Sequence, residues 1–404
     1  MSRSARYTFI LALVALGTAL AAAGGWRYAR ASAPVNGPII LISIDALRAD
    51  RLPAYGYRGV RTPALDALAA DGIVFERAYS HVPQTLPAHA SLLTGRLPFE
   101  TGVRDGVGFS LKGSERTLPE MLADRGYVTA GLVSSYLLRK DSGVAQGFSF
   151  FDAEMNRGPA EAPALLRDSL ATEEMAEHWL DSSGTDRAFL FLHLSELHRP
   201  FDDETGGASP SALYDQRVAR EDTAVGALVR YLKSHQLYDR STIVLAADHG
   251  EGLGDHGESA HGLLAYEETL RVPLIIKLPG AEQAGRRVKD PVQHIDIVPT
   301  ILDLAKAPIP GNLRGRSLTP LFSGNSRVST PIYAESLFGR YHFGAGDIVS
   351  LTDGRYRYIK APRPELYDLE TDPRQQENIL ESHGDVSRVF DAAIGKIVTE
   401  TPVS

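Results

Sequence analysis

A largely apolar run near the N-terminus most constrains the fold of this chain. Residues 39–44 read IILISI, follow the linker 34–38 and end directly before Asp45. Apolar side chains that do not alternate with polar ones need cover on both faces of a strand, which is typical of a parallel sheet between helices. A second run of this kind, 242–247, ends before Asp248.

Strand-like and helical segments alternate along most of the chain. This alternation predicts right-handed crossovers and an α/β fold in which helices flank a mostly parallel central sheet. Further strands are expected at 73–75, 127–134, 188–194 and 274–278, and helices at 63–71, 118–125, 161–180, 213–235 and 297–304.

After about residue 324 the pattern changes to short strands, at 347–352 and 355–360, followed by a C-terminal helix. We therefore expect a catalytic domain at 38–324 and a small C-terminal α+β subdomain at 325–404.

The N-terminal segment 1–33 differs from the rest. Arg3 and Arg6 precede an uncharged stretch, 7–26, that is rich in Leu and Ala. Two interpretations fit: a cleaved signal peptide or a single membrane anchor. The arginines place its start in the cytoplasm, so under either interpretation the body of the protein is exported. A periplasmic or extracytoplasmic location follows, either free or anchored to the inner membrane.

Composition excludes several classes of function. The 404 residues carry a net charge of -8 without a basic run, so nucleic acid is not an expected partner. The chain has no cysteine, which excludes disulfides, thiolate metal ligands and a cysteine nucleophile.

The two strand ends predict a metal site. Ligands gather at the carboxyl ends of strands in open α/β sheets, where Asp45 and Asp248 are expected to lie, with His249 directly after. Two carboxylates and an imidazole suit a divalent cation such as Zn, Mn, Ca or Mg.

The stretch TLPAHASLLTG, residues 85–95, predicts a helix that starts near Thr85 and stops at Gly95. Thr85 is either its N-cap or a nucleophile that a nearby metal activates. The two roles are compatible, because a helix N-terminus presents free N–H groups to an anionic ester.

Several multi-residue motifs carry a family resemblance. They are DALRADRLPAYGYRGVRTPALDALAADGIVFERAYS, TLPAHASLLTG, AADHGEGLGDHG, YEETLRVPLIIKLPG, HIDIVPTILDL and ELYDLETDP. In this order they resemble the sulfatase branch of the alkaline phosphatase superfamily, from about residue 39 to 378. The resemblance implies that Asp45, Thr85, Asp248 and His249 hold a metal. It also implies in-line displacement at phosphorus or sulfur through a Thr-bound intermediate.

The resemblance also suggests roles for residues outside this metal set. His198 is similar in place to a family histidine beside the transferred group. His261 falls near a sulfatase lysine that contacts the substrate, so it is a candidate donor or ligand of a second metal. Glu196 is a further candidate for a second cation, and the alternative interpretation, which is favoured, is a solvated carboxylate. Arg48 and Asp50 match positions that look like a structural ion pair or cap.

The chain departs from the sulfatase pattern at the nucleophile. Sulfatases oxidise a Cys or Ser, within C-x-P-S-R, to formylglycine, whereas this chain has Thr85, Pro87, Ala88 and His89. A secondary alcohol cannot give that aldehyde. A Thr nucleophile resembles the phosphoester-cleaving relatives, and nucleotide pyrophosphatase/phosphodiesterases also have the Pro and His, which makes His89 a catalytic candidate.

Two further family features are missing. Ala46 stands where a second carboxylate is usual, and the Gly-Lys-x-x-His segment is replaced by GLVSSYLLRK, whose only basic residues are Arg139 and Lys140. Both changes weaken the case for sulfate esters.

The sequence therefore predicts an exported, metal-dependent hydrolase of phosphate mono- or diesters that forms a covalent Thr85 intermediate. Its expected substrate is a small-molecule, glycan or lipid anionic ester. Alternatives are a sulfuric ester hydrolase, a phosphoethanolamine-type transferase, or an inactive member that binds an anionic glycan or lipid headgroup. Transferases of this superfamily usually follow several membrane helices, whereas this sequence offers at most one. Hydrolysis is therefore expected before group transfer.

Overall fold

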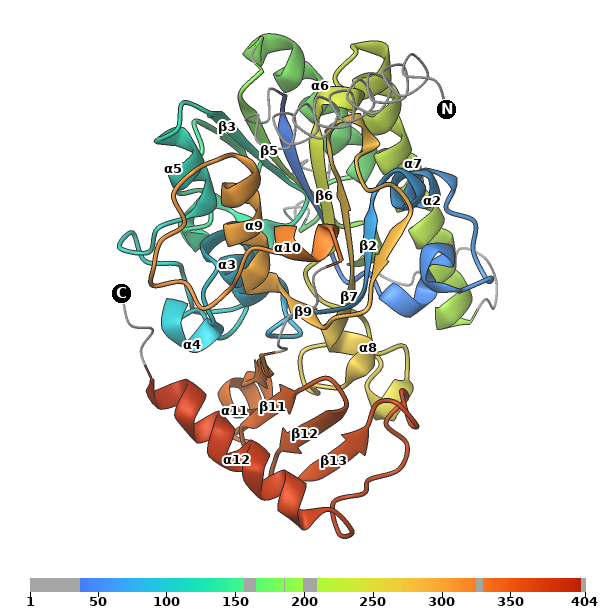
Figure 1. The fold of residues 1–404 in the computed structure, drawn as a ribbon, viewed down its shortest axis with the longest axis vertical. Helices are drawn as coiled ribbons and strands as arrows, with labels where there is room; N and C mark the ends of the chain where they lie inside the picture. The colour runs from blue at the N-terminus through green and yellow to red at the C-terminus, as the bar shows by residue number, and fades with distance from the viewer. Residues whose placement is uncertain (1–36, 156–164, 185, 199–208, 325–329, 401–404) are drawn as a thin grey trace, which may run out of the picture. The chain divides into compact units, whose positions relative to one another are not determined.

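A nine-stranded sheet forms the centre of the structure, a computed structural model that describes residues 37–155, 165–184, 186–198, 209–324 and 330–400 (Figure 1). The described residues belong to one compact unit, Asn36–Ser404. The expected signal or anchor at 1–33 lies outside the described residues. Among the described helices, none is long and apolar enough to cross a membrane.

The strand order of this sheet is β4-β3-β5-β1-β6-β7-β2-β8, and β9 also pairs with β2. Only β7 runs antiparallel to its neighbours, so the expected mostly parallel sheet is confirmed. The strands are β1 (Ile39–Ile44), β2 (Ile73–Tyr79), β3 (Val128–Val133), β4 (Phe150–Asp152), β5 (Ala188–Leu194), β6 (Thr242–Ala247), β7 (Arg271–Lys277), β8 (Arg286–Val288) and β9 (Val292–Gln293).

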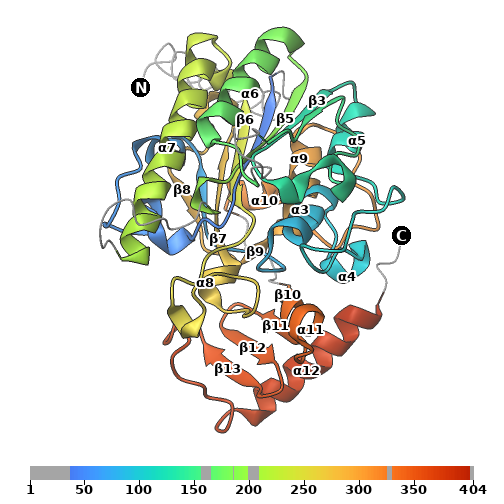
Figure 2. The same ribbon diagram turned by 180° about the vertical axis from the view of Figure 1, so that it is seen from behind.

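Helices cover both faces of this sheet, as Figures 1 and 2 show. One face carries α2 (Pro63–Asp71), α6 (Ser169–Ser183) and α7 (Pro210–Ser234). The other carries α3 (Thr85–Thr94), α5 (Leu118–Ala123), α9 (Ile297–Leu304) and α10 (Thr319–Phe322). Two short helices, α4 (Pro98–Thr101) and α8 (Glu267–Leu270), lie in connections.

The central strands are buried as their apolar runs predict. Every residue of β1, β5 and β6 is buried. In register, Ile44 of β1 pairs with Leu194 of β5 and Ala247 of β6. The three strands therefore end together, and the residues that follow them meet at one edge of the sheet.

A second sheet follows in the chain, antiparallel and four-stranded, as expected for a C-terminal α+β part. It consists of β10 (Ile332–Ser336), β11 (Ile348–Thr352), β12 (Tyr356–Lys360) and β13 (Glu365–Asp368), with helices α11 (Phe338–Phe343) and α12 (Gly384–Thr399). A shared apolar cluster joins Leu97 and Ile295 to Tyr333 and Phe390 of this part. The division into domains at residue 324 stays a prediction.

One expected helix was wrong at its start. Of the predicted range 161–180, residues 161–164 lie outside the described residues, and α6 begins only at Ser169. The Asp168 side chain caps it by accepting hydrogen bonds from the N–H groups of Leu170 and Ala171. Just before it, Leu166 forms a bridge with Ser135 in extended conformation, which a helix would prevent.

Candidate functional site

The turn after β1 places the first carboxylate. Ala46, next to Asp45, adopts a left-handed conformation (φ 57°), which is uncommon for a residue other than glycine and often marks a functional site. Its N–H donates to Asp248 Oδ1 at 3.1 Å, and its carbonyl accepts from the buried Tyr214 hydroxyl at 2.8 Å. That hydroxyl also accepts from the Arg48 N–H at 2.8 Å. Tyr214 thus fixes the turn that orients Asp45.

Thr85 is the first residue of α3, so the predicted start of this helix is confirmed, whereas the interpretation of Thr85 as the N-cap is wrong. The N-cap position belongs to Gln84, and no side chain caps the helix. The Thr85 hydroxyl instead lies 3.3 Å from both Asp45 Oδ1 and His249 Nε2. At the other end, Gly95 has the left-handed conformation (φ 69°) that ends a helix, as predicted.

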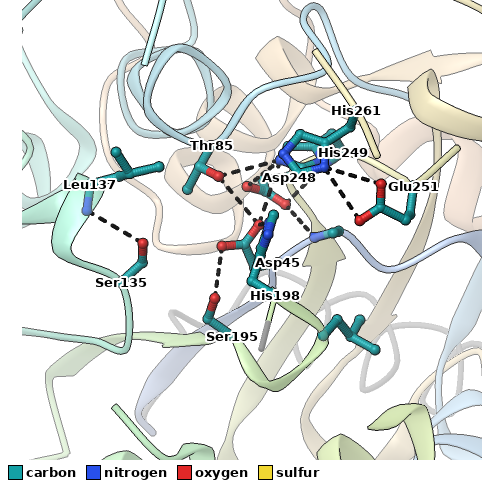
Figure 3. A network of polar contacts seen from close by, with 12 residues as sticks. Asp45, Thr85, Ser135, Leu137, Ser195, His198, Asp248, His249, Glu251 and His261 are labelled. Atoms are coloured by element: carbon teal, nitrogen blue, oxygen red, sulfur yellow. Dashed lines mark hydrogen bonds and ion pairs between the residues drawn. The ribbon is translucent and has the colours of Figure 1, made fainter. Parts of the chain in front are cut away.

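The structure brings the four expected metal ligands together (Figure 3). Ligand atoms of Asp45, Asp248 and His249 all lie within 4.8 Å of one another, and the three side chains are buried. Burial and the adjacent Asp45 charge raise the pKa of Asp248 well above its usual range. Its Oδ2 atom has no hydrogen-bond partner. A cation would satisfy this oxygen and screen the two carboxylates, so the residues fit a divalent metal.

A second cluster of imidazoles adjoins the first. Ligand atoms of His198, His249 and His261 lie within 4.8 Å of one another, and His261 Nδ1 is 3.2 Å from Glu251 Oε1. His198 Nε2 is 2.8 Å from Asp45 Oδ1. Burial lowers the pKa of His198, but the charge of Asp45, its hydrogen bond to His198 and the charge of Glu251 together outweigh burial and raise the pKa. Burial and the neighbouring His261 lower the pKa of His249.

Glu196, a candidate for a second cation or a solvated carboxylate, is buried and pairs with Arg220. Its Oε1 atom is 2.9 Å from Arg220 Nε, and it is absent from the ligand groups found among the described residues. The carboxylate beside His261 is Glu251.

His89 lies beneath the nucleophile and is fully buried. Its Nδ1 atom is 2.7 Å from the Thr85 carbonyl, and its Nε2 atom is 2.9 Å from Ser43 Oγ. Burial and the adjacent His193 lower the pKa of His89 to about 3. Since both ring nitrogens are engaged, this arrangement suits a neutral side chain that positions Thr85.

Sequence reasoning missed two residues that hold Asp45. Ser195 Oγ donates to Asp45 Oδ2 at 2.9 Å, and His193 Nε2 is 3.4 Å from the same oxygen. Burial raises the pKa of Asp45, but the charges and hydrogen bonds of His198 and His193 oppose it. The pKa of Asp45 therefore lies well below the usual range. Polar residues at the end of the apolar strand 188–194 were a signal, because β5 pairs with β1.

The remaining expected positions have structural partners. Arg48 pairs with Asp50 at 2.8 Å, as predicted, and also with Asp255 at 2.8 Å. Arg48 is buried, whereas Asp50 is half-exposed. Arg139 pairs with Asp141 at 2.7 Å.

A buried carboxylic acid supports the loop after β5. Glu221 Oε1 accepts from the Glu196 N–H and from Ser169 Oγ at 3.1 Å, and Ser169 Oγ accepts from the Ser195 N–H at 3.2 Å. Burial raises the pKa of Glu221 to about 8, although its two donors oppose the shift. This acid therefore fixes the loop that places Ser195 and His198 beside Asp45.

Glu221→Gln should change how stability depends on pH. The folded pKa of about 8 lies above the ordinary 4.5, so the stability that Glu221 contributes is full below about pH 4.5 and is lost as pH rises through 8. Glutamine mimics the neutral acid at every pH. We expect the variant to gain a few kcal/mol relative to the parent between about pH 5 and 9. Urea unfolding at pH 5, 7 and 9 measures this gain, with the exposed Glu381→Gln as control. A constant difference at all three pH values would contradict it.

Comparisons with known proteins identify the family of this chain. The family model described as Sulfatase matches residues 38–307, and the model of the N-sulphoglucosamine sulphohydrolase C-terminal region matches 254–394. Arylsulfatase A of Homo sapiens is 27% identical over 89% of this chain and 86% of its own length. N-acetylglucosamine-6-O-sulfatase of Bacteroides thetaiotaomicron is 23% identical over 85% of this chain and 82% of its own.

A solved structure shows the same fold. The phosphonate monoester hydrolase of Agrobacterium radiobacter superposes with a TM-score of 0.73 at 22% identity, covering 90% of this chain and 95% of its own. The Sulfatase model covers most of the described main sheet and the cluster around Thr85. The chain belongs to the sulfatase family.

Proposed function

We propose that this sulfatase-family hydrolase is metal-dependent and cleaves phosphate mono- or diesters through a covalent Thr85 intermediate. One observation supports this most: the Thr85 hydroxyl lies 3.3 Å from both Asp45 and His249, and the ligand atoms of the buried Asp45, Asp248 and His249 lie within 4.8 Å of one another. Threonine cannot be converted to formylglycine, whereas a threonine alkoxide is a competent nucleophile toward phosphorus.

Asp45, Asp248, His249 and Thr85 would hold the metal. A divalent cation there acts as a Lewis acid and makes a bound hydroxyl more acidic. Asp45 accepts the Thr85 hydrogen bond and so aims the oxygen at the ester. The first turn of α3 directs its positive dipole end toward the transferred anionic group.

The histidines line the same site and can move protons. His198, whose pKa the Asp45 charge raises, is a donor for the departing alcohol oxygen. His261, held by Glu251, lies beside it with ring centroids 4.6 Å apart. Water then attacks the phosphorus, the bond to Thr85 Oγ1 breaks, phosphate or its remaining monoester leaves, and a proton from the water restores the Thr85 hydroxyl.

Sulfate ester hydrolysis is the second candidate, because the relatives found are mostly named as sulfatases. Export to the periplasm or another extracytoplasmic space remains a proposal that rests on the charge and composition of residues 1–33.

A panel of chromogenic esters distinguishes the two candidates. The full chain is assayed with aryl phosphate, bis-aryl phosphate and aryl sulfate, before and after a chelator, with bound metal measured in parallel. We expect phosphoester cleavage that the chelator removes and a divalent cation restores, with sulfate cleavage slower by about 100-fold or more. Faster sulfate cleavage would favour the second candidate. Stoichiometric metal with no turnover of any ester would indicate a binding protein.

A further inference from the structure

Helix α11, which follows β10, adjoins the segment that precedes the nucleophile. A Cβ atom placed on Gly262, the residue after His261, would lie 3.6 Å from Gln84 Cγ and 3.8 Å from Phe338 Cγ. A Cβ atom on Gly339 of α11 would lie 3.7 Å from Leu263. Gln84 immediately precedes Thr85. The loop that carries His261, the start of α3 and α11 therefore adjoin one another.

The loop 105–109 contacts both Gln84 and α11. Gln84 Nε2 donates to Asp105 Oδ2 at 3.3 Å, and His342 of α11 lies 3.0 Å from Asp105 Oδ1. The rings of Phe109 and Tyr341 are 5.2 Å apart between centroids. The loop 105–109 and α11 thus contact each other through the polar pair Asp105 and His342 and through the aromatic pair Phe109 and Tyr341.

Large apolar side chains of α11, the loop 105–109 and the segment after His261 are exposed to solvent. We call Val107, Phe109, Leu263, Tyr341 and Phe343 the apolar rim. Phe343 is 71% exposed, Val107 65%, Tyr341 45% and Leu263 40%, and Phe109 is partly buried. Single exposed apolar residues are ordinary, but several that lie on adjoining segments are typical of a binding surface.

Apolar residues also occupy a neighbouring segment of the site. The short helix Tyr136–Leu138 contacts α3, and Tyr136 is 42% exposed. Figure 3 shows Leu137 on the Thr85 side of the cluster. The Arg139 guanidinium lies over the Tyr136 ring at 4.6 Å and pairs with Asp141.

Charges at the rim do not suit a polyanionic sugar. Arg104 makes two hydrogen bonds of 2.7 Å to Glu335, and Arg340 of α11 pairs with Asp347 at 2.9 Å. These guanidinium groups are already neutralised by carboxylates. Asp105 adds a buried negative charge next to Gln84. A glycan with several sulfate groups would meet no excess of positive charge at these residues.

We infer that the apolar rim binds the alcohol part of the ester, and that this part is an alkyl or aryl group rather than a polyanionic sugar. The inference rests on the proposed function, since the rim adjoins the Thr85 site. The anionic group would lie at the metal-ligand cluster, and the apolar group would extend along α11 toward Phe343. Each methylene buried there adds affinity.

Binding of alkylphosphonates tests the inference without requiring turnover. Methyl-, butyl- and octylphosphonate, which carry no ester bond, are titrated into the full chain by calorimetry. A fully buried methylene contributes roughly fourfold in affinity, so a half-open rim should give about tenfold or more between butyl and octyl. The Tyr341→Ser/Phe343→Ser double variant should lose this dependence on chain length while still binding methylphosphonate as the parent does.

The control is Val389→Ser, which removes an equally exposed apolar side chain (67%) from α12. It should bind all three probes as the parent does. Affinity that is independent of chain length in the parent, or tighter binding of a disulfated disaccharide than of octylphosphonate, would overturn the inference. The proposed function fails separately, through ester cleavage that persists without Thr85.

Discussion

Thr85→Ala is expected to abolish ester hydrolysis without unfolding the protein. The substitution removes the only hydroxyl that lies within hydrogen-bonding distance of both Asp45 and His249 among the described residues. Loss of a covalent nucleophile lowers kcat by about three orders of magnitude or more. Alanine is a good helix former, so α3 should persist and the melting temperature should change little. Steady-state assays with aryl phosphate and thermal unfolding measure the two effects.

Two substitutions control this result. Thr85→Ser keeps a hydroxyl at the same position and should retain a substantial part of the activity. Thr94→Ala removes a buried hydroxyl at the other end of α3, where Thr94 Oγ1 donates to the Ala90 carbonyl at 2.6 Å. It should affect stability more than catalysis. Parental kcat in Thr85→Ala would show that the nucleophile is misassigned.

Asp248→Asn is expected to have opposite effects on stability with and without metal. Asp248 is fully buried, and burial together with the Asp45 charge raises its pKa, so its ionisation destabilises the metal-free fold at neutral pH. Asparagine keeps an oxygen for the N–H groups of Ala46 and His249. In chelator the variant should be more stable by about 1–3 kcal/mol. With cation, only the parent should gain stability, because the variant loses a charged ligand.

Urea unfolding in chelator and in excess cation measures both effects. Asp222→Asn is the matched control: Asp222 is buried and accepts from the N–H groups of Ala64 and Leu65, outside the metal cluster. Its response to cation should equal that of the parent. The assignment of Asp248 as a ligand would be contradicted if Asp248→Asn were destabilised in chelator and still stabilised by cation.

Much of the main sheet is predictable from local pattern. Two strands and two helices have the expected bounds: 188–194, 242–247, 63–71 and 297–304. In these segments a continuous apolar run or a clear helical repeat of apolar residues distinguishes strand from helix. The antiparallel direction of β7 was not predicted, since pairing with β6 and β2 depends on the tertiary fold. The start of α6 was misplaced because Asp168 ends an extended segment by capping the helix.

The candidate site is predictable where a residue directly follows a strand. Asp45 and Asp248 meet because β1 and β6 are neighbours in register. Ser195, His193 and Glu221 were missed because their roles depend on contacts across strands and helices that no short motif encodes. The cap assignment of Thr85 failed for a related reason: the helix starts one residue earlier, which frees the hydroxyl to face Asp45.

The covalent intermediate on Thr85 tests the central claim most directly. The metal-loaded full chain is mixed with an aryl phosphate that carries an isotopic label on phosphorus, quenched in acid within one turnover, digested and mapped by mass spectrometry. The account predicts labelled phosphate on the peptide that contains Thr85, and none in Thr85→Ala. Labelled phosphate released without any adduct on that peptide, or an adduct on another residue, would contradict it.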